Sequence, residues 1–279
     1  MKTLKKQTLI LLSIASLFLV GLAVFAHLHK KEEQANYSNL NSKASISEVR
    51  AILSKHLNEE SVDNFINLVT DYNDTVGSVG LSGSFAPFTK TDYDVEKISS
   101  LWTAKHGDFI GTNCRINTYT LLKGKIKIPQ VKSDTELLFQ DKDAIDKGKL
   151  FNAKDQSNFD ILFSRVKTEA TQDVKVHAKH MEDYYKQFTF DDKARMLSVV
   201  VHDNLDGDYL FVGHVGVLVP TTDGYLFVEK LTFEEPYQAI KFASKKDCYK
   251  YLTTKYKDYT GPGLAKPFIM DNDKWVDMD

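Results

Sequence analysis

Cysteine is scarce in this chain, which has only two, Cys114 and Cys248, among its 279 residues. An exported protein of this size that depended on disulfide bonds would be expected to carry more, so the sequence excludes a disulfide-rich scaffold. Two possibilities remain open for this pair: one bridge between Cys114 and Cys248, or two free thiols.

An excess of charge of one sign is also missing. Lysine and arginine number 36, aspartate and glutamate 38, and the formal net charge is -2. Charges of both signs are interspersed along the chain, whereas binding to a polyanion needs basic side chains gathered on one face. The sequence therefore gives no support for a nucleic-acid partner.

Long hydrophobic runs are absent except at the N-terminus. Residues 9–26 contain no charge, and Lys2, Lys5 and Lys6 precede them. A cationic start followed by an uncharged apolar run is typical of a secretory signal. Because 18 residues is close to the shortest length that spans a bilayer, a retained anchor is the alternative. We expect residues 1–26 to be a signal peptide or an N-terminal membrane anchor, and the protein to be extracytoplasmic, secreted or membrane-anchored.

The polar segment after this run predicts a linker. Residues 27–43 are rich in Asn, Ser, Lys and Glu, with Tyr37 and Leu40 as the only larger apolar groups. We place a single domain at 44–279, because roughly 235 residues suffice for one large core and no internal repeat is visible.

Helical patterns fill the first part of that domain. The sequence Ser45-Ile46-Ser47-Glu48 is a capping box that predicts a helix start, and a second helix is expected over 61–72. After a glycine-rich irregular segment, a further helix is expected to begin near Cys114, with Thr112 or Asn113 as its N-cap. Residues 129–190 read as mostly helical.

The C-terminal third has the composition of β-strands. Residues 196–202, 209–219 and 225–233 are rich in β-branched and aromatic side chains, and turn-forming segments separate them. Three sequential strands joined by short turns form an antiparallel meander. A helix is expected over 244–256. The predicted fold class is α+β, with N-terminal helices followed by an antiparallel β-meander.

Cys114 is the candidate nucleophile because of its place at a predicted helix start. Free N–H groups and the positive end of the helix dipole stabilise a thiolate there and lower its pKa. Backbone amides near Asn113 and Cys114, with Thr112 beside them, could hold an oxyanion. The alternative is that Cys114 is a small packed residue with no chemical role.

His214 and Glu229 are the candidate partners of Cys114. His214 follows Gly213 on a predicted strand and precedes the sequence Val215-Gly216, so small neighbours let another element approach its ring. If Pro220 pairs with Tyr225 across the turn, Glu229 lies diagonally opposite His214 on one face of the sheet. A carboxylate there would orient the imidazole and stabilise its positive charge. The alternative for Glu229 is a solvated strand residue.

Three other segments contain clustered acidic, histidine or aromatic residues, but their patterns do not indicate a metal or cofactor site. His177 and His180 share one helical face, but no third ligand accompanies them, so a solvated helix face is expected rather than a metal site. Residues 203–208 resemble the start of a calcium loop, but the twelfth position of that loop is His214 rather than glutamate, so a hairpin turn is expected. Residues 233–242 are aromatic and fit either a groove lining or the core. No cofactor or metal is expected.

Two resemblances to known families follow from these motifs. A cysteine that opens a helix, followed later by His-Val-Gly on a strand, resembles the papain-like cysteine hydrolases of the NlpC and P60 type. The chain differs from them by having Asn113-Cys114-Arg115-Ile116 in place of their usual Asp-Cys-Ser-Gly. A broader resemblance is to the exported Gram-positive family called domain of unknown function 4300, which implies one exported domain but no activity. It rests on four segments, Tyr37-Ser38-Asn39-Leu40, Thr112-Asn113-Cys114-Arg115, Gly213-His214-Val215-Gly216-Val217-Leu218 and Phe233-Glu234-Glu235-Pro236-Tyr237-Gln238-Ala239-Ile240-Lys241-Phe242.

These observations lead to one expected function and one rival. The expected protein is a cysteine hydrolase or amidase that cleaves a peptide amide of the cell envelope, with Cys114, His214 and Glu229 as catalytic residues. Its partner would be a cell-wall peptide or an envelope protein, and the membrane if the N-terminal segment is retained. The rival is a non-catalytic envelope binding module in which Cys114 is structural.

Overall fold

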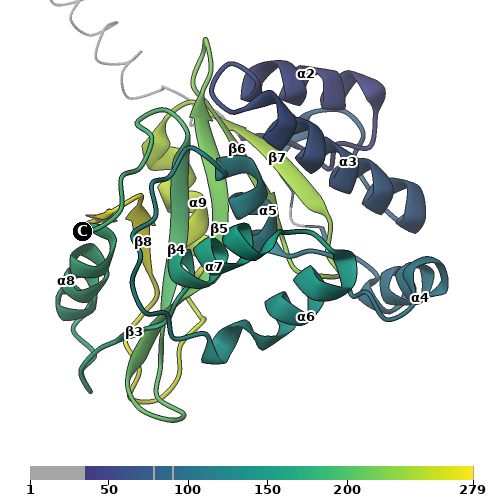
Figure 1. The fold of residues 1–279 in the computed structure, drawn as a ribbon. Coiled ribbons are helices and arrows are strands. Elements are labelled where there is room, and N and C mark those ends of the chain that lie inside the picture. The colour runs from purple at the N-terminus through teal and green to yellow at the C-terminus, as the bar shows by residue number, and fades with distance from the viewer. Residues whose placement is uncertain (1–34, 78, 90, 279) are drawn as a thin grey trace, which may run out of the picture. The chain divides into compact units, whose positions relative to one another are not determined.

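Residues 35–77, 79–89 and 91–278 are described by the computed structural model of the protein (Figure 1). Helices come first along the chain and an antiparallel sheet follows, which confirms the predicted α+β class. The expected export segment, residues 9–26, lies outside the described residues. No helix in the described part combines the length and hydrophobicity that crossing a membrane requires.

A single antiparallel sheet organises the described residues. Its order is β2-β1-β7-β6-β5-β4-β8-β9, and β3 pairs with β5 outside this path. The strands are β1 (Asn36–Ser38), β2 (Ala86–Pro87), β3 (Val166–Lys167), β4 (Arg195–Asp203), β5 (Tyr209–Pro220), β6 (Tyr225–Lys230), β7 (Tyr237–Phe242), β8 (Phe268–Asp271) and β9 (Lys274–Val276).

The predicted meander is the centre of this sheet. β4, β5 and β6 pair in sequence, and Pro220 faces Tyr225 as the turn predicted. Residues 204–208 form the β4–β5 hairpin turn, in agreement with the sequence interpretation. The meander continues into β7, where the aromatic segment 233–242 contributes a strand and core residues.

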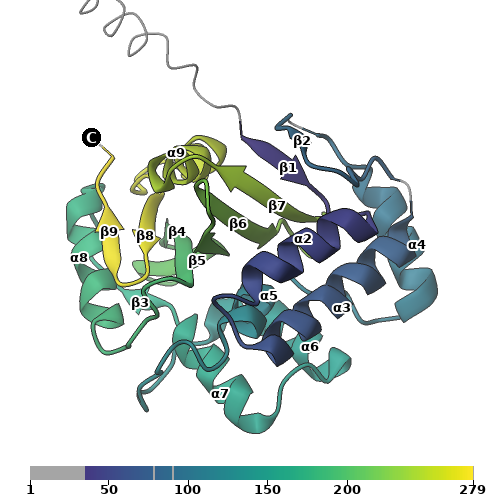
Figure 2. The same ribbon diagram turned by 90° about the horizontal axis from the view of Figure 1, so that it is seen from above.

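Helices cover both faces of the sheet. They are α2 (Lys43–Leu53), α3 (Glu59–Val76), α4 (Val95–His106), α5 (Cys114–Leu122), α6 (Phe139–Gly148), α7 (Ala153–Leu162), α8 (Val174–Tyr185) and α9 (Lys245–Tyr256). Figure 2 shows α9 against one face of β6 and β7, while α2, α3 and α5 lie on the other. The apolar residues accordingly form two clusters, a small one under α9 and a larger one on the opposite face.

Several sequence predictions need correction. The predicted linker 27–43 is wrong in its described part, because residues 36–38 form β1 and Lys43 already belongs to α2. Residues 27–34 lie outside the described residues. The N-cap of α2 is Ser42, whose side chain accepts a hydrogen bond from the Ser45 N–H, so Ser45 is not the cap. His177 is buried rather than solvated, because Thr168 and the Thr171 carbonyl bond its two ring nitrogens.

Gly216 provides a test of the central strand packing. A Cβ at this position would lie 2.4 Å from the Phe227 ring and 2.7 Å from the Val228 carbonyl oxygen. We expect Gly216→Ala to lower the free energy of unfolding by about 2 kcal/mol, because the backbone oxygen has no room to move. Urea titration of wild type and variant measures the difference.

Gly261→Ala is the matched control, since its Cβ would meet nothing closer than 3.7 Å. It should change the free energy of unfolding by less than about 0.5 kcal/mol. Equal effects of the two substitutions would contradict the close approach of β5 and β6 at Gly216.

Candidate active site

Cys114 is the first residue of α5, as the sequence predicts. Asn113 is the N-cap, and its side-chain oxygen accepts a hydrogen bond of 3.1 Å from the Ile116 N–H. The Cys114 side chain is nearly enclosed, and the residue is 5% exposed. The thiol therefore lies at the end of the helix where the dipole favours a negative charge.

The other two candidate residues lie on neighbouring strands, beyond the point where the pairing of these strands ends. Pairing between β5 and β6 ends at Val217 and Val228, whereas β6 stays paired with β7 as far as Lys230. His214 on β5 and Glu229 on β6 lie just beyond the last pair. Both are buried, and α5 packs against both strands.

The structure brings Cys114, His214 and Glu229 together. His214 Nε2 lies 2.5 Å from Glu229 Oε2, and the thiol of Cys114 interacts with the His214 side chain strongly enough to shift the pKa of both groups. Because Glu229 occupies Nε2, the ring nitrogen left for the thiol is Nδ1. The imidazole thus lies between a thiol and a carboxylate, which is the arrangement that activates a nucleophilic cysteine.

Electrostatics favour the charged forms of this pair. Burial alone would raise the pKa of Cys114, but the charge and hydrogen bond of His214, together with the charge of Arg115, lower the pKa below its ordinary value. Burial alone would lower the pKa of His214, yet Cys114 and Glu229 raise it. These directions support a thiolate–imidazolium pair at neutral pH.

Glu229 is held ionised by residues of α9. Burial raises its pKa, but Lys255, the hydrogen bond and charge of His214, and Tyr251 outweigh burial and lower the pKa to about 2. Glu229 Oε1 accepts a hydrogen bond from the Tyr251 hydroxyl at 2.5 Å and lies 3.3 Å from Lys255 Nζ. This fully buried carboxylate is therefore not the solvated strand residue of the alternative interpretation.

Tyr256 encloses the other side of the imidazole. Its ring stacks on His214 with centroids 4.8 Å apart and an angle of 23° between the planes. Stacking of this kind excludes water from the His214–Glu229 hydrogen bond and strengthens it. Tyr251, Lys255 and Tyr256 all come from α9, and no sequence motif indicated their role.

Arg115 fixes the start of α5 to its surroundings. Its guanidinium forms two bonds to the fully buried carboxylate of Asp141 on α6, at 2.9 and 2.7 Å, and a third to the Val212 carbonyl on β5 at 2.9 Å. A bidentate pair of this kind sets the orientation as well as the distance. The sequence did not indicate the contact between Arg115 and Asp141, because Asp141 lies 26 residues away in a helix that carries no recognisable motif.

Thr112 and Asn113 support the helix start. The Asn113 side-chain amide donates to Asp141, and the Thr112 hydroxyl bonds the Tyr237 hydroxyl at 2.9 Å. Within the described residues, no acceptor engages the backbone N–H groups of Asn113 and Cys114. These two N–H groups are consequently the available donors for an oxyanion.

Cys248 lies apart from this site. Both cysteines are free, and Cys248 belongs to the apolar cluster under α9, whereas Cys114 belongs to the cluster on the other face. Burial raises the pKa of Cys248 well above its ordinary value. Of the two arrangements that the sequence left open, the structure has the free thiols.

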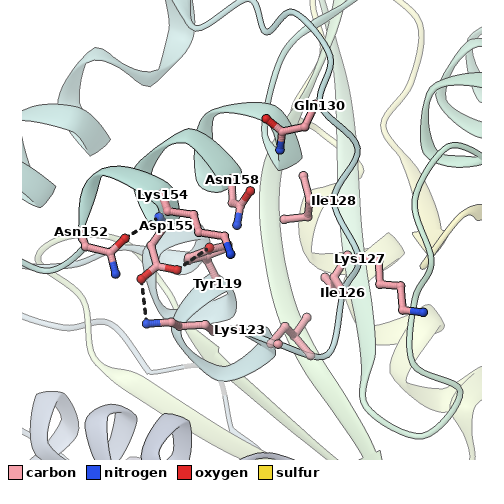
Figure 3. Close-up of a pocket in the computed structure, with 12 residues that line it drawn as sticks. Tyr119, Lys123, Ile126, Lys127, Ile128, Gln130, Asn152, Lys154, Asp155 and Asn158 are labelled. Atoms are coloured by element: carbon pink, nitrogen blue, oxygen red, sulfur yellow. Dashed lines mark hydrogen bonds and ion pairs between the residues drawn. The ribbon is translucent and has the colours of Figure 1, made fainter.

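A separate pocket of about 640 Å³ lies at the opposite end of α5 (Figure 3). Tyr119 and Leu122, from the C-terminal half of the helix, line it together with Lys123, Lys154 and Asp155. Asp155 is bonded to both Tyr119 and Lys123. The pocket does not include the catalytic candidates. Among the described residues, no cluster of three or more His, Cys, Asp or Glu side chains is arranged to hold a metal ion.

Comparison with known proteins supports one family domain. A family model described as "Domain of unknown function (DUF4300)" matches residues 36–276. No curated protein and no solved structure matches the chain. The family match includes every residue of the candidate site.

The pH dependence of alkylation tests the thiolate. We expect iodoacetamide to label Cys114 with a midpoint below the ordinary thiol pKa of about 8.5, because the imidazolium of His214 stabilises the thiolate. The rate should therefore be retained as the pH falls towards the midpoint and lost below it. Glu229→Gln should raise the midpoint, because it removes the charge that stabilises the imidazolium. Mass spectrometry of the folded, non-reduced protein measures both.

Cys248 is the internal control, since its buried thiol should stay unlabelled until the protein is denatured. A Cys114 that labels only above pH 8.5, or a Glu229→Gln midpoint equal to that of wild type, would show that the three side chains do not act together.

Proposed function

The chain belongs to the family described as domain of unknown function DUF4300, and we propose that it is a cysteine hydrolase or amidase that cleaves peptide amides outside the cytoplasm. The family description names no activity, so the proposal depends on the residues of the site.

One observation carries the proposal: a cysteine at a helix N-terminus interacts with a histidine whose ring is bonded to a buried, ionised glutamate. Each member has the environment that its role requires. The thiol pKa is lowered, the imidazole is oriented, and the carboxylate is kept charged.

The first chemical step is acylation of Cys114. The thiolate attacks the carbonyl carbon and forms a C–S bond, and the negative charge moves to the carbonyl oxygen. The backbone N–H groups of Asn113 and Cys114 stabilise this oxyanion. When the C–N bond breaks, His214 gives its proton to the leaving nitrogen, so an amine departs and a thioester remains.

The second step is hydrolysis of the thioester. Neutral His214 takes a proton from a water molecule, which attacks the thioester carbon. The C–S bond then breaks, releasing a carboxylic acid and restoring the Cys114 thiolate beside the His214 imidazolium. Glu229 keeps the ring oriented and balances its charge throughout, without itself taking a proton.

A peptide amide of the cell envelope is the proposed substrate. Support comes from the signal-like segment at residues 1–26 and from the resemblance of the cysteine and histidine motifs to hydrolases of the NlpC and P60 type. The departure at Asn113-Cys114-Arg115 has a structural explanation here, because Arg115 and Asn113 both bond to Asp141. The compartment and the resemblance are the basis of this assignment.

Low exposure at the site favours the rival function. Cys114 is 5% exposed and His214 is 1% exposed, as expected of packed residues. In that case the protein is an envelope binding module, and the three side chains form a buried structural network. The two functions differ in whether Cys114 is consumed and regenerated during turnover.

Hydrolysis of wall peptides distinguishes the hydrolase from the binding module. Incubation of the purified protein with peptidoglycan fragments should yield new amine and carboxylate ends, detected by mass spectrometry. Cys114→Ser should lower the rate by at least about a thousand-fold, because it removes the nucleophile.

Cys248→Ala is the matched control and should retain the activity once the protein is folded. If wild type and Cys114→Ser are equally inactive on wall fragments and on a panel of unrelated peptide amides, the rival function is supported.

Export can be tested by cell fractionation. We expect the full chain to reach the extracytoplasmic fraction, and a variant lacking residues 1–26 to remain inside, because the cationic start and apolar run would direct translocation. The mass of the exported protein distinguishes a cleaved signal from a retained anchor. Equal distribution of both forms inside the cell would contradict export.

A further inference from the structure

Lys230 is a buried cation that the proposed chemistry does not use. It follows Glu229 on β6, and the residue is 1% exposed. Successive side chains of a strand point to opposite faces. Glu229 therefore faces α9, where it meets Tyr251 and Lys255, while Lys230 faces the side covered by α3 and α5.

Backbone carbonyls and aromatic rings surround the ammonium group. Lys230 Nζ donates hydrogen bonds to the carbonyls of Thr232 at 2.8 Å, Phe233 at 3.1 Å and Glu235. It also lies 4.1 Å from the centre of the Tyr72 ring and 5.2 Å from that of Tyr237. These bonds fasten residues 231–236, the β6–β7 loop.

Lys230 forms no ion pair within the described part of the chain. Carbonyls and ring faces are weaker compensation than a carboxylate, so a buried lysine here is costly. Burial lowers its pKa to about 7, although the carboxylates of Glu234 and Glu235 act through space to raise it. An apolar side chain of the same length would avoid this cost, so the charge itself calls for an explanation.

Short contacts connect this lysine to the start of α5. Tyr237, one of its two ring neighbours, bonds through its hydroxyl to Thr112. Thr112 in turn accepts from the Asn117 side chain, which also donates to the Asn113 carbonyl at 2.7 Å. A negative charge on Cys114 raises the pKa of Lys230, which places the two groups within electrostatic reach of each other.

We propose that Lys230 is a positioning residue for Cys114: its ammonium group holds the 231–236 loop in place and supplies positive charge that stabilises the thiolate. This inference rests on the proposed role of Cys114 as the nucleophile. The other charged or titratable groups around Cys114 are His214 on β5, Glu229 on β6, Arg115 on α5, Asp141 on α6 and Tyr256 on α9.

Substitution of Lys230 tests the role of its charge. Lys230→Met keeps the length of the side chain and removes the cation. We expect it to raise the alkylation midpoint of Cys114 by about one pH unit, because a nearby positive charge no longer favours the thiolate. Circular dichroism confirms that the variant is folded.

Tyr72→Phe is the matched control for loosening of the same loop. It removes the hydrogen bond from the Tyr72 hydroxyl to the Glu234 carbonyl but leaves the ring and the cation in place. Its midpoint should stay within about 0.3 pH units of wild type. Equal shifts in the two variants, or no shift in Lys230→Met, would overturn the proposal.

A reciprocal measurement needs no change at Lys230. Coupling between two sites is mutual, so removal of the thiolate must lower the pKa of Lys230. The carbon-13 resonance of the Lys230 Cε, followed against pH in wild type and Cys114→Ser, should show a lower midpoint in the variant. An unchanged midpoint would overturn the proposal even if Lys230→Met fails to fold.

Failure of the proposed function gives a different result. Cys114 in wild type would then react no faster than an ordinary thiol at any pH, whereas failure of the Lys230 inference leaves a reactive Cys114 whose midpoint is insensitive to Lys230→Met.

Discussion

The hydrogen bond between His214 and Glu229 is the interaction on which the rest of the site depends. An ionised carboxylate that is 2% exposed is stable only if its charge is compensated. Here the compensation comes from three directions: the imidazole, the Tyr251 hydroxyl and the Lys255 ammonium. In turn, the charge of Glu229 makes a positive imidazole favourable in a buried place, and the imidazole favours the thiolate of Cys114.

The sheet makes room for this interaction. β5 and β6 stop pairing at Val217 and Val228, and the ring of His214 and the carboxylate of Glu229 meet beyond this last pair. The same strand then presents adjacent residues to opposite faces, Glu229 towards α9 and Lys230 towards α3 and α5. One short segment of β6 thus places an anion behind the imidazole and, as we infer, a cation near the thiol.

The local sequence predicts much of the site and of the central sheet. The Asn113–Cys114 helix start, the β4–β6 meander and the Pro220–Tyr225 register follow from capping, β-propensity and turn chemistry, which act over a few residues. The same patterns predict that Cys114, His214 and Glu229 form one catalytic group. Their proximity in the structure agrees with it, while their catalytic roles stay predictions.

The remaining parts depend on contacts between distant residues. Asp141 on α6 and Tyr256 on α9 lie in helices whose local patterns do not specify what they touch. The local sequence does not predict β1, because three residues in a polar segment form a strand only through pairing with β7 and β2. The burial of Lys230 likewise has no local signal, since its acceptors are backbone carbonyls of the following loop.

Nitrogen-15 NMR of the His214 ring at neutral pH tests the thiolate–imidazolium pair, because it reports the protonation of both ring nitrogens. Both should be protonated in wild type, as in an imidazolium, and the titration midpoint should fall in Cys114→Ser, where no thiolate favours the charge. A neutral imidazole at pH 7 in wild type, with a midpoint unchanged by Cys114→Ser, would contradict the thiolate–imidazolium pair.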